Sequence, residues 1–189
     1  MKSDQELFEK GLATYQKVVA ANYMAHWEVY ETLRQVLLDE ASDGFVFADL
    51  ACGTAPGSAA ALACGTAPGS AAALAGSNVA RYIGIDISQP SLDAAKEALA
   101  PLTCPVELRC GDFVAAIDSW KGPLDVVWIG QSLHHLLAPD KRNFMRKIRD
   151  LLPRDGLFLI WEPTRLESED REGWLERFHK IRPEWGDGL

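Results

Sequence analysis

The chain has 189 residues, of which 48% are hydrophobic and 24% are charged. This length and composition predict one folded domain with a buried core, and they exclude a disordered chain. The net charge of −8 and the pI near 5.0 argue against a nucleic-acid partner, because the field around such a protein repels phosphate.

The sequence carries no sign of a membrane or secretory protein. Its first ten residues are rich in charge, and no apolar stretch approaches the roughly 20 residues needed to cross a bilayer. The cysteines also lack the paired C-x-x-C spacing of a zinc site. We therefore expect a cytoplasmic protein with free thiols, no membrane partner and no bound metal.

The amino-terminal part of the chain has a helical pattern. Apolar residues recur at helical spacing over residues 4–41, which predicts two amphipathic helices that are joined or kinked near Asn22. The turn residues 42–44 end this pattern. We expect a single domain in which residues 1–41 form a helical lid and residues 42–189 form the core.

From residue 45 onward, short apolar runs alternate with helical segments. Five runs are rich in Val, Ile, Phe or Trp and are bounded by Gly, Pro or Asp, as strands are. The predicted strands are residues 45–50, 81–87, 106–110, 124–130 and 157–162, and the predicted helices are residues 88–99, 139–152 and 167–182. This alternation predicts an α/β fold with helices on both faces of a mainly parallel sheet.

A sequence of twelve residues, ACGTAPGSAAAL, occurs twice in tandem, as a first copy at residues 51–62 and a second copy at residues 63–74. Two copies of this length indicate a local duplication and not a repeat architecture. The first copy follows a convincing strand, and Asp49 lies two positions before its first alanine. We therefore take the first copy as the loop that binds a ligand, and the second as a surplus turn and short helix.

The spacing to the next strand favours the second copy instead. Asp86 ends that strand and lies 21 positions after Gly65 of the second copy, but 33 positions after Gly53 of the first copy. The shorter spacing is near the roughly 20 residues expected in dinucleotide-binding folds. The local sequence and the spacing therefore favour different copies.

Small or acidic residues follow the first three predicted strands. The small-residue turn after residues 45–50 lets a ligand approach the backbone, and the helical stretch after it offers unpaired N–H groups. Asp86 at the end of the second strand could accept hydrogen bonds from both hydroxyls of a ribose. Asp112 beside Phe113, after the third strand, suits the amine and the ring face of adenine. These residues favour an adenosine-type ligand.

In chain order, the segments DLACGT, GIDIS, GDF, DVVWIGQSLHHL and LLPRDGLFLIWEP resemble the successive motifs of Rossmann-like (class I) S-adenosylmethionine-dependent methyltransferases, especially the small-molecule branch. The resemblance covers about residues 45–163. It implies a Rossmann-like three-layer sandwich, S-adenosylmethionine as the cofactor, and methyl transfer to an oxygen, nitrogen or carbon nucleophile of a small molecule.

The sequence departs from this family in two ways. The family usually has glycine at the positions of Ala51 and Ala55, where a methyl group narrows the approach to the backbone. The family also usually ends in two further strands, one of them antiparallel, and neither is predicted after residue 162. The C-terminal strands are therefore expected to be missing, which would leave the fifth strand as an exposed sheet edge.

The resemblance implies a role for residues at four strand ends. Asp49 would bond near the amino group of the cofactor, and Asp86 would take the ribose hydroxyls. Ile87 would cover the adenine, and Asp112 with Phe113 would hold the adenine edge. The turn after the first strand would pack against the methionine and the ribose, and the end of the fourth strand would flank the methionine; the residues are Ala51, Cys52, Gly53, Gly130 and Gln131.

Each acid also has a purely structural interpretation. Asp49 could be a buried acid that bonds loop amides, and Asp86 could be a turn acid beside Ser88. Asp112 could cap the helix that follows it.

Two histidines and a fifth strand end are candidates for the acceptor side. His134 or His135 could be a general base, because imidazole titrates near neutral pH. Neighbouring helical residues point about 100° apart, so at most one of them can face the methyl group. Packing or pocket lining is the alternative for both. Residues 161–163 could line the acceptor pocket.

Two other functions compete with methyl transfer. The duplication or the missing strands could have produced a catalytically disabled, methyltransferase-like binding module. An NAD-dependent oxidoreductase would share the strand order and the ribose acid, but the turn at residues 51–58 lacks the G-x-G-x-x-G arrangement that admits a pyrophosphate.

Overall fold

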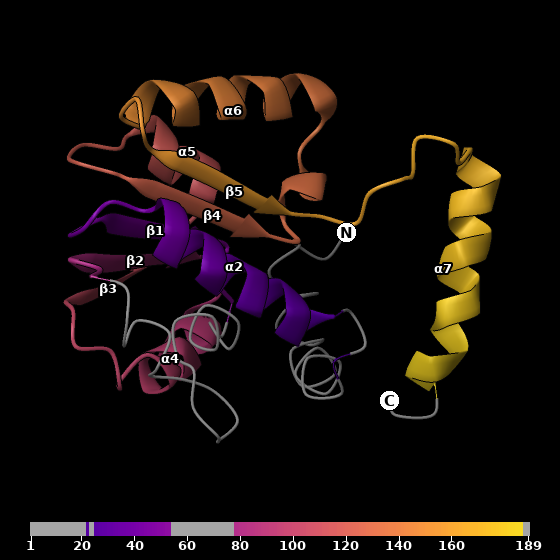
Figure 1. Ribbon diagram of the computed structural model, residues 1–189, viewed down its shortest axis with the longest axis horizontal. Coiled ribbons are helices and arrows are strands. Elements are labelled where there is room, and N and C mark those ends of the chain that lie inside the picture. Colours follow the sequence, from indigo (N-terminus) through magenta and orange to yellow (C-terminus); the bar gives the residue numbers. More distant parts are fainter. Residues whose placement is uncertain (1–21, 23–24, 54–77, 187–189) are drawn as a thin grey trace. The chain divides into compact units, whose positions relative to one another are not determined.

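The computed structural model describes residues 22, 25–53 and 78–186 (Figure 1). Its contacts divide the chain into two compact units. One unit is residues 27–162, and the other combines residues 1–26 with residues 163–189. The sheet and the residues expected to bind the cofactor lie in the unit of residues 27–162. The division into a lid at residues 1–41 and a core at residues 42–189 stays a prediction.

Five strands form one parallel sheet, which confirms the predicted fold class. The strands are β1 (Val46–Leu50), β2 (Arg81–Asp86), β3 (Val106–Cys110), β4 (Val126–Gly130) and β5 (Leu157–Trp161). Their order in space is β3-β2-β1-β4-β5, as Figure 1 shows. The direction of the order reverses between β1 and β4, and ligands of such sheets bind at this reversal, beyond the carboxyl ends of the strands.

Helices cover both faces of the sheet, so the unit has three layers (Figure 1). The helices of the unit are α2 (His26–Glu40), α4 (Gln89–Ala98), α5 (Phe113–Asp118) and α6 (Ala138–Leu151), and η1 (Leu133–His135) is a single 3-10 turn. On one face, side chains of α2 and α4 such as Leu33 and Ala95 pack with Phe47 and Tyr82. On the other face, side chains of α5 and α6 pack with the alternate strand residues, such as Ile83.

Helix α4 begins within one residue of the start that the sequence predicts. Ser88 caps α4, because its side chain accepts a hydrogen bond from the backbone N–H of Ser91 over 3.3 Å. Pro90 lies in the first turn, where its missing N–H costs nothing. This cap fixes the chain direction immediately after Asp86.

In the other unit, α7 (Arg171–Gly186) begins four residues later than predicted. Asp170 caps it by accepting a hydrogen bond from the N–H of Gly173 over 2.8 Å. Between β5 and residue 186 the described chain adds no further strand, as expected. Every helix in the described part of the chain is too short or too polar to span a bilayer.

Candidate functional site

The parallel sheet brings the predicted site residues to one edge. Leu50 of β1 lies beside Ile129 of β4, and Asp86 of β2 lies beside Cys110 of β3. Since the strands are parallel, the loops that follow them all leave from the carboxyl edge of the sheet. The loops after β1 and β4 begin at the reversal of the strand order.

Asp86 connects two of these loops. Its side chain is only 6% exposed. One carboxylate oxygen, Oδ2, accepts a hydrogen bond from the N–H of Gly53 over 2.9 Å, and the other, Oδ1, accepts one from the N–H of Ser88 over 2.9 Å. Burial raises the pKa of Asp86, and the bonds from the N–H groups of Ser88, Gly53 and Ile87 partly offset that rise. A buried carboxylate with a raised pKa at a strand end is typical of functional sites.

The turn after β1 has an unusual backbone conformation. Ala51 and Gly53 both have positive φ angles, of 56° and 57°. Alanine rarely adopts this left-handed conformation, and glycine, which the related family usually carries at this position, adopts it without strain. A Cβ atom added to Gly53 would have no atom of the described residues within 4 Å. Among the residues that the structure describes, none fills the space beside Gly53.

The side chain of Cys52 points into the protein. The thiol is buried, and burial is the main cause that raises its pKa. Its Sγ atom lies 3.1 Å from where a Cβ of Gly84 would be, and its N–H donates to the carbonyl of Ile85 over 3.0 Å. Any contact of Cys52 with a ligand would therefore come from its backbone.

Asp49 is buried inside the sheet layer. Its carboxylate is 2% exposed and accepts a hydrogen bond from the hydroxyl of Tyr82 over 2.6 Å. The Tyr82 ring in turn stacks on Phe47, with ring centroids 5.8 Å apart. This contact supports the structural interpretation of Asp49, and its role toward a cofactor stays a prediction.

Asp112 and Phe113 have clear structural roles. Asp112 caps α5, because its carboxylate accepts from the N–H of Ala115 over 2.8 Å. The ring of Phe113 meets Phe144 of α6 edge-on, with centroids 5.3 Å apart. The capping interpretation of Asp112 is thus confirmed as a local structure, and the predicted adenine contact of both residues stays a prediction.

The end of β4 is held close to the end of β5. Gly130 lies beside Trp161, and a Cβ atom added to Gly130 would come within 3.4 Å of the Trp161 ring. Gln131 has a φ of 53°, and its N–H donates to the carbonyl of Trp161 over 2.7 Å. The turn that leads into η1 is therefore fixed to β5.

Both histidines lie in η1, and the structure joins one of them to β5. His134 Nδ1 lies 2.8 Å from Glu162 Oε2, while Glu162 Oε1 accepts from the N–H of Leu133 over 2.5 Å. The His135 ring lies beside the His134 ring, with centroids 4.3 Å apart. The sequence alone does not join these residues, because His134 and Glu162 are 28 positions apart and only the pairing of β4 with β5 brings them together.

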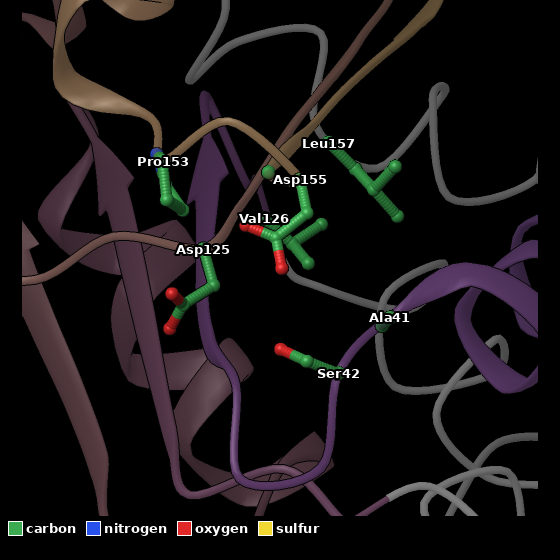
Figure 2. Close-up of a pocket in the computed structure, with 8 residues that line it drawn as sticks. Ala41, Ser42, Asp125, Val126, Pro153, Asp155 and Leu157 are labelled. Atoms are coloured by element: carbon green, nitrogen blue, oxygen red, sulfur yellow. The ribbon is translucent and has the colours of Figure 1, made fainter.

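A cavity at the opposite edge of the sheet is too small for a nucleoside (Figure 2). It lies at the amino ends of β4 and β5, and Asp125, Asp155 and Ser42 are among its lining residues. Its volume is about 100 Å³, whereas sites for small organic ligands usually measure about 300–1,000 Å³. In the described part of the chain, His, Cys, Asp and Glu form no group of three that could hold a metal ion.

A methyltransferase domain family matches residues 59–156, which is just over half of the chain. The chain belongs to this methyltransferase domain family. The match includes the whole second copy and β2 to β4, but it begins after β1 and after Gly53. Among the described residues, Gly53 of the first copy contacts Asp86.

Solved methyltransferases share the fold. The plantazolicin methyltransferase BpumL in complex with SAH has a TM-score of 0.59 and 14% identity over 92% of this chain and 63% of its own. A methyltransferase from Clostridium acetobutylicum has a TM-score of 0.54 and 18% identity over 82% of this chain and 56% of its own. One from Thiobacillus denitrificans, in complex with S-adenosyl-L-homocysteine, has a TM-score of 0.54 and 20% identity over 80% of this chain and 54% of its own.

These likenesses show the Rossmann-like methyltransferase fold. The chain spans about half to two thirds of the length of those three structures. Among curated proteins, none matches the sequence.

Proposed function

We propose that this methyltransferase domain binds S-adenosylmethionine at the carboxyl edge of its sheet and transfers the methyl group to a small molecule. The observation that carries this proposal is the contact between Asp86 and Gly53, which joins a buried carboxylate to a glycine turn at the reversal of the strand order. Membership of the family and the SAH-bound structures of similar fold support it.

The residues present fit this cofactor. A carboxylate has about four lone pairs, so Asp86 can accept a hydrogen bond from a ribose hydroxyl in addition to those from the N–H groups of Gly53, Ser88 and Ile87. The Gly53 turn would lie along the ribose and methionine, with Ala51 and the backbone of Cys52. Ile87 and the Asp112–Phe113 pair would contact the adenine, and Asp49, Gly130 and Gln131 would lie near the methionine.

The sulfonium of S-adenosylmethionine supplies a methyl group that is already activated. The chain therefore has to align the acceptor with that methyl group and exclude water, and it needs no covalent intermediate. A small acceptor is the expectation that fits the net charge of −8, because a nucleic acid would be repelled from the surface. We also propose that the protein is cytoplasmic, because its cysteines fit free thiols in a reducing compartment.

Thermal stabilisation tests the class of function. S-adenosylmethionine and S-adenosylhomocysteine should raise the melting temperature in a saturable way, and NAD should not. Stabilisation by NAD alone would identify an oxidoreductase and contradict the proposal.

The family match, which begins inside the first copy and includes the whole second copy, favours one alternative, a binding module disabled by the duplication. A variant lacking residues 63–74 separates the two, and because the copies are identical it is the same protein whichever copy is removed. If only the shortened variant were stabilised by S-adenosylmethionine, the duplication would be what disables the domain. Equal stabilisation of both forms is the result that we expect.

A further inference from the structure

Glu162 is a fixed carboxylate, unlike the partners in most surface ion pairs. Its side chain is 12% exposed, whereas that of His134 is 46% exposed. One of its oxygens is held by the N–H of Leu133 over 2.5 Å, and the other lies 2.8 Å from His134 Nδ1. Exposed pairs are weak because two mobile side chains must be ordered, but here the carboxylate is already held by the backbone.

This contact selects one tautomer of His134. An ionised carboxylate can only accept hydrogen bonds, so the proton of a neutral His134 lies on Nδ1. The other ring nitrogen, Nε2, then carries a lone pair that can accept a proton. The same carboxylate stabilises the imidazolium that forms when Nε2 takes that proton.

The pair lies on the other side of the strand-order reversal from the residues proposed to hold the nucleoside. Asp86 ends β2 and Asp112 follows β3, whereas His134 and Glu162 follow β4 and β5. His135, whose ring lies beside that of His134, is the neighbouring titratable group on the same turn. It has no carboxylate at hydrogen-bond distance among the described contacts, so the geometry distinguishes the two histidines.

We propose that His134 Nε2 is the general base for an acceptor that carries a hydroxyl group, and that Glu162 is its positioning residue. This inference rests on the proposed methyl transfer. In the transfer, the acceptor oxygen bonds to the methyl carbon as the carbon–sulfur bond breaks, and the sulfur keeps the electron pair. The hydroxyl proton passes to Nε2 and later to solvent, and Glu162 balances the charge of the imidazolium meanwhile.

The tautomer can be tested without an acceptor. Long-range 15N–1H correlation spectra of the full chain, recorded with the His134 ring neutral, should show a protonated Nδ1 and an unprotonated Nε2. Glu162→Gln keeps an oxygen that can accept from Nδ1–H and should keep the tautomer, whereas Glu162→Ala should move the proton to Nε2. A proton on Nε2 in the wild type, or no change in Glu162→Ala, would overturn the proposal.

Labelled products test the acceptor class. After incubation of a metabolite extract with methyl-labelled S-adenosylmethionine, mass spectrometry should find the label on oxygen, as a methyl ether. His134→Gln should form this product at least tenfold more slowly at neutral pH and lose less at high pH, where the acceptor ionises by itself, and His135→Gln should change the rate less than threefold. Label on a carboxylate, on a thioether sulfur or on a tertiary amine, none of which loses a proton at neutral pH, would contradict a base role.

A third readout separates this inference from the proposed function. Stabilisation by S-adenosylmethionine should be the same in the wild type, His134→Gln and Glu162→Gln. If the cofactor binds and the wild type forms an oxygen-labelled product at the same rate as His134→Gln, the base assignment alone fails. If S-adenosylmethionine does not bind the wild type, the proposed methyl transfer is wrong. The base role of His134 is then wrong as well, even if the proton of His134 lies on Nδ1.

Discussion

Ala51, the first residue of the turn after β1, is strained because its φ is positive. The left-handed conformation costs alanine about 1–2 kcal/mol, and the greater freedom of an unfolded glycine cancels part of the gain from replacing it. We predict that Ala51→Gly raises the free energy of unfolding by about 0.5–1 kcal/mol in urea denaturation. Ala98→Gly, at the end of α4 in ordinary helical conformation, should lower it. A loss of stability in Ala51→Gly would show that the strain is absent.

His26 should make the stability depend on pH. Its side chain is 1% exposed, and burial lowers its pKa from 6.5 to about 4. The unfolded chain therefore takes up a proton near pH 6.5, while the folded chain resists it until about pH 4. The stability from neutral His26 is complete above pH 6.5 and is lost as the pH falls toward 4, by up to about 3 kcal/mol.

Urea denaturation between pH 7.5 and pH 4 can measure this loss, with the wild type and His26→Phe compared at each pH. As the pH falls, the free energy of unfolding of the wild type should decrease relative to that of His26→Phe, because phenylalanine takes up no proton. A difference that is constant over this range would show that His26 is as easily protonated in the folded chain as in the unfolded chain.

Single residues were predicted best where a strand end carries its own signal. Asp86 could be found because it follows a run of buried β-formers and precedes a serine cap. The partner of His134 could not be found, because it depends on the register that places Gly130 beside Trp161. Asp112 had two valid interpretations in the sequence, and the contact with the N–H of Ala115 supports the capping one.

Among the elements, the turn after β1 is the one for which different observations favour different copies of the duplicated sequence. The spacing to Asp86 and the family match both favour the second copy, but β1 leads directly into the first, and Gly53 contacts Asp86. Residue spacing cannot decide this, because the connection between β1 and β2 contains two identical sequences. Strand propensity can decide which copy follows a strand, because residues 45–50 are far better β-formers than the alanines before the second copy.

The duplication supplies a matched pair of variants for this element. Gly53→Val and Gly65→Val make the same change in the same local sequence. Gly53 has a φ of 57°, which valine adopts only with strain, so Gly53→Val should weaken S-adenosylmethionine binding at least tenfold in calorimetry. Gly65→Val should leave the affinity within twofold. The reverse pattern would make the second copy the ligand loop.

At the scale of the whole molecule, the alternation of strands and helices was enough to predict the sheet. All five strands lie where the pattern placed them, within two residues at each end, because buried parallel strands are short apolar runs between turn residues. The strand order was implied only by the resemblance, since many orders satisfy the same pattern. The short elements α5 and η1 were not predicted, because segments of six and three residues carry too little periodicity.

The account depends most on Asp86 as the residue that holds the ribose, and titration calorimetry with S-adenosylmethionine tests it directly. Asp86→Asn keeps the size of the side chain but replaces one accepting oxygen with a donor, so the affinity should fall at least tenfold. Asp93→Asn makes the same change at an exposed position on α4 and should bind as the wild type does. Equal affinity of the wild type and Asp86→Asn would contradict the account.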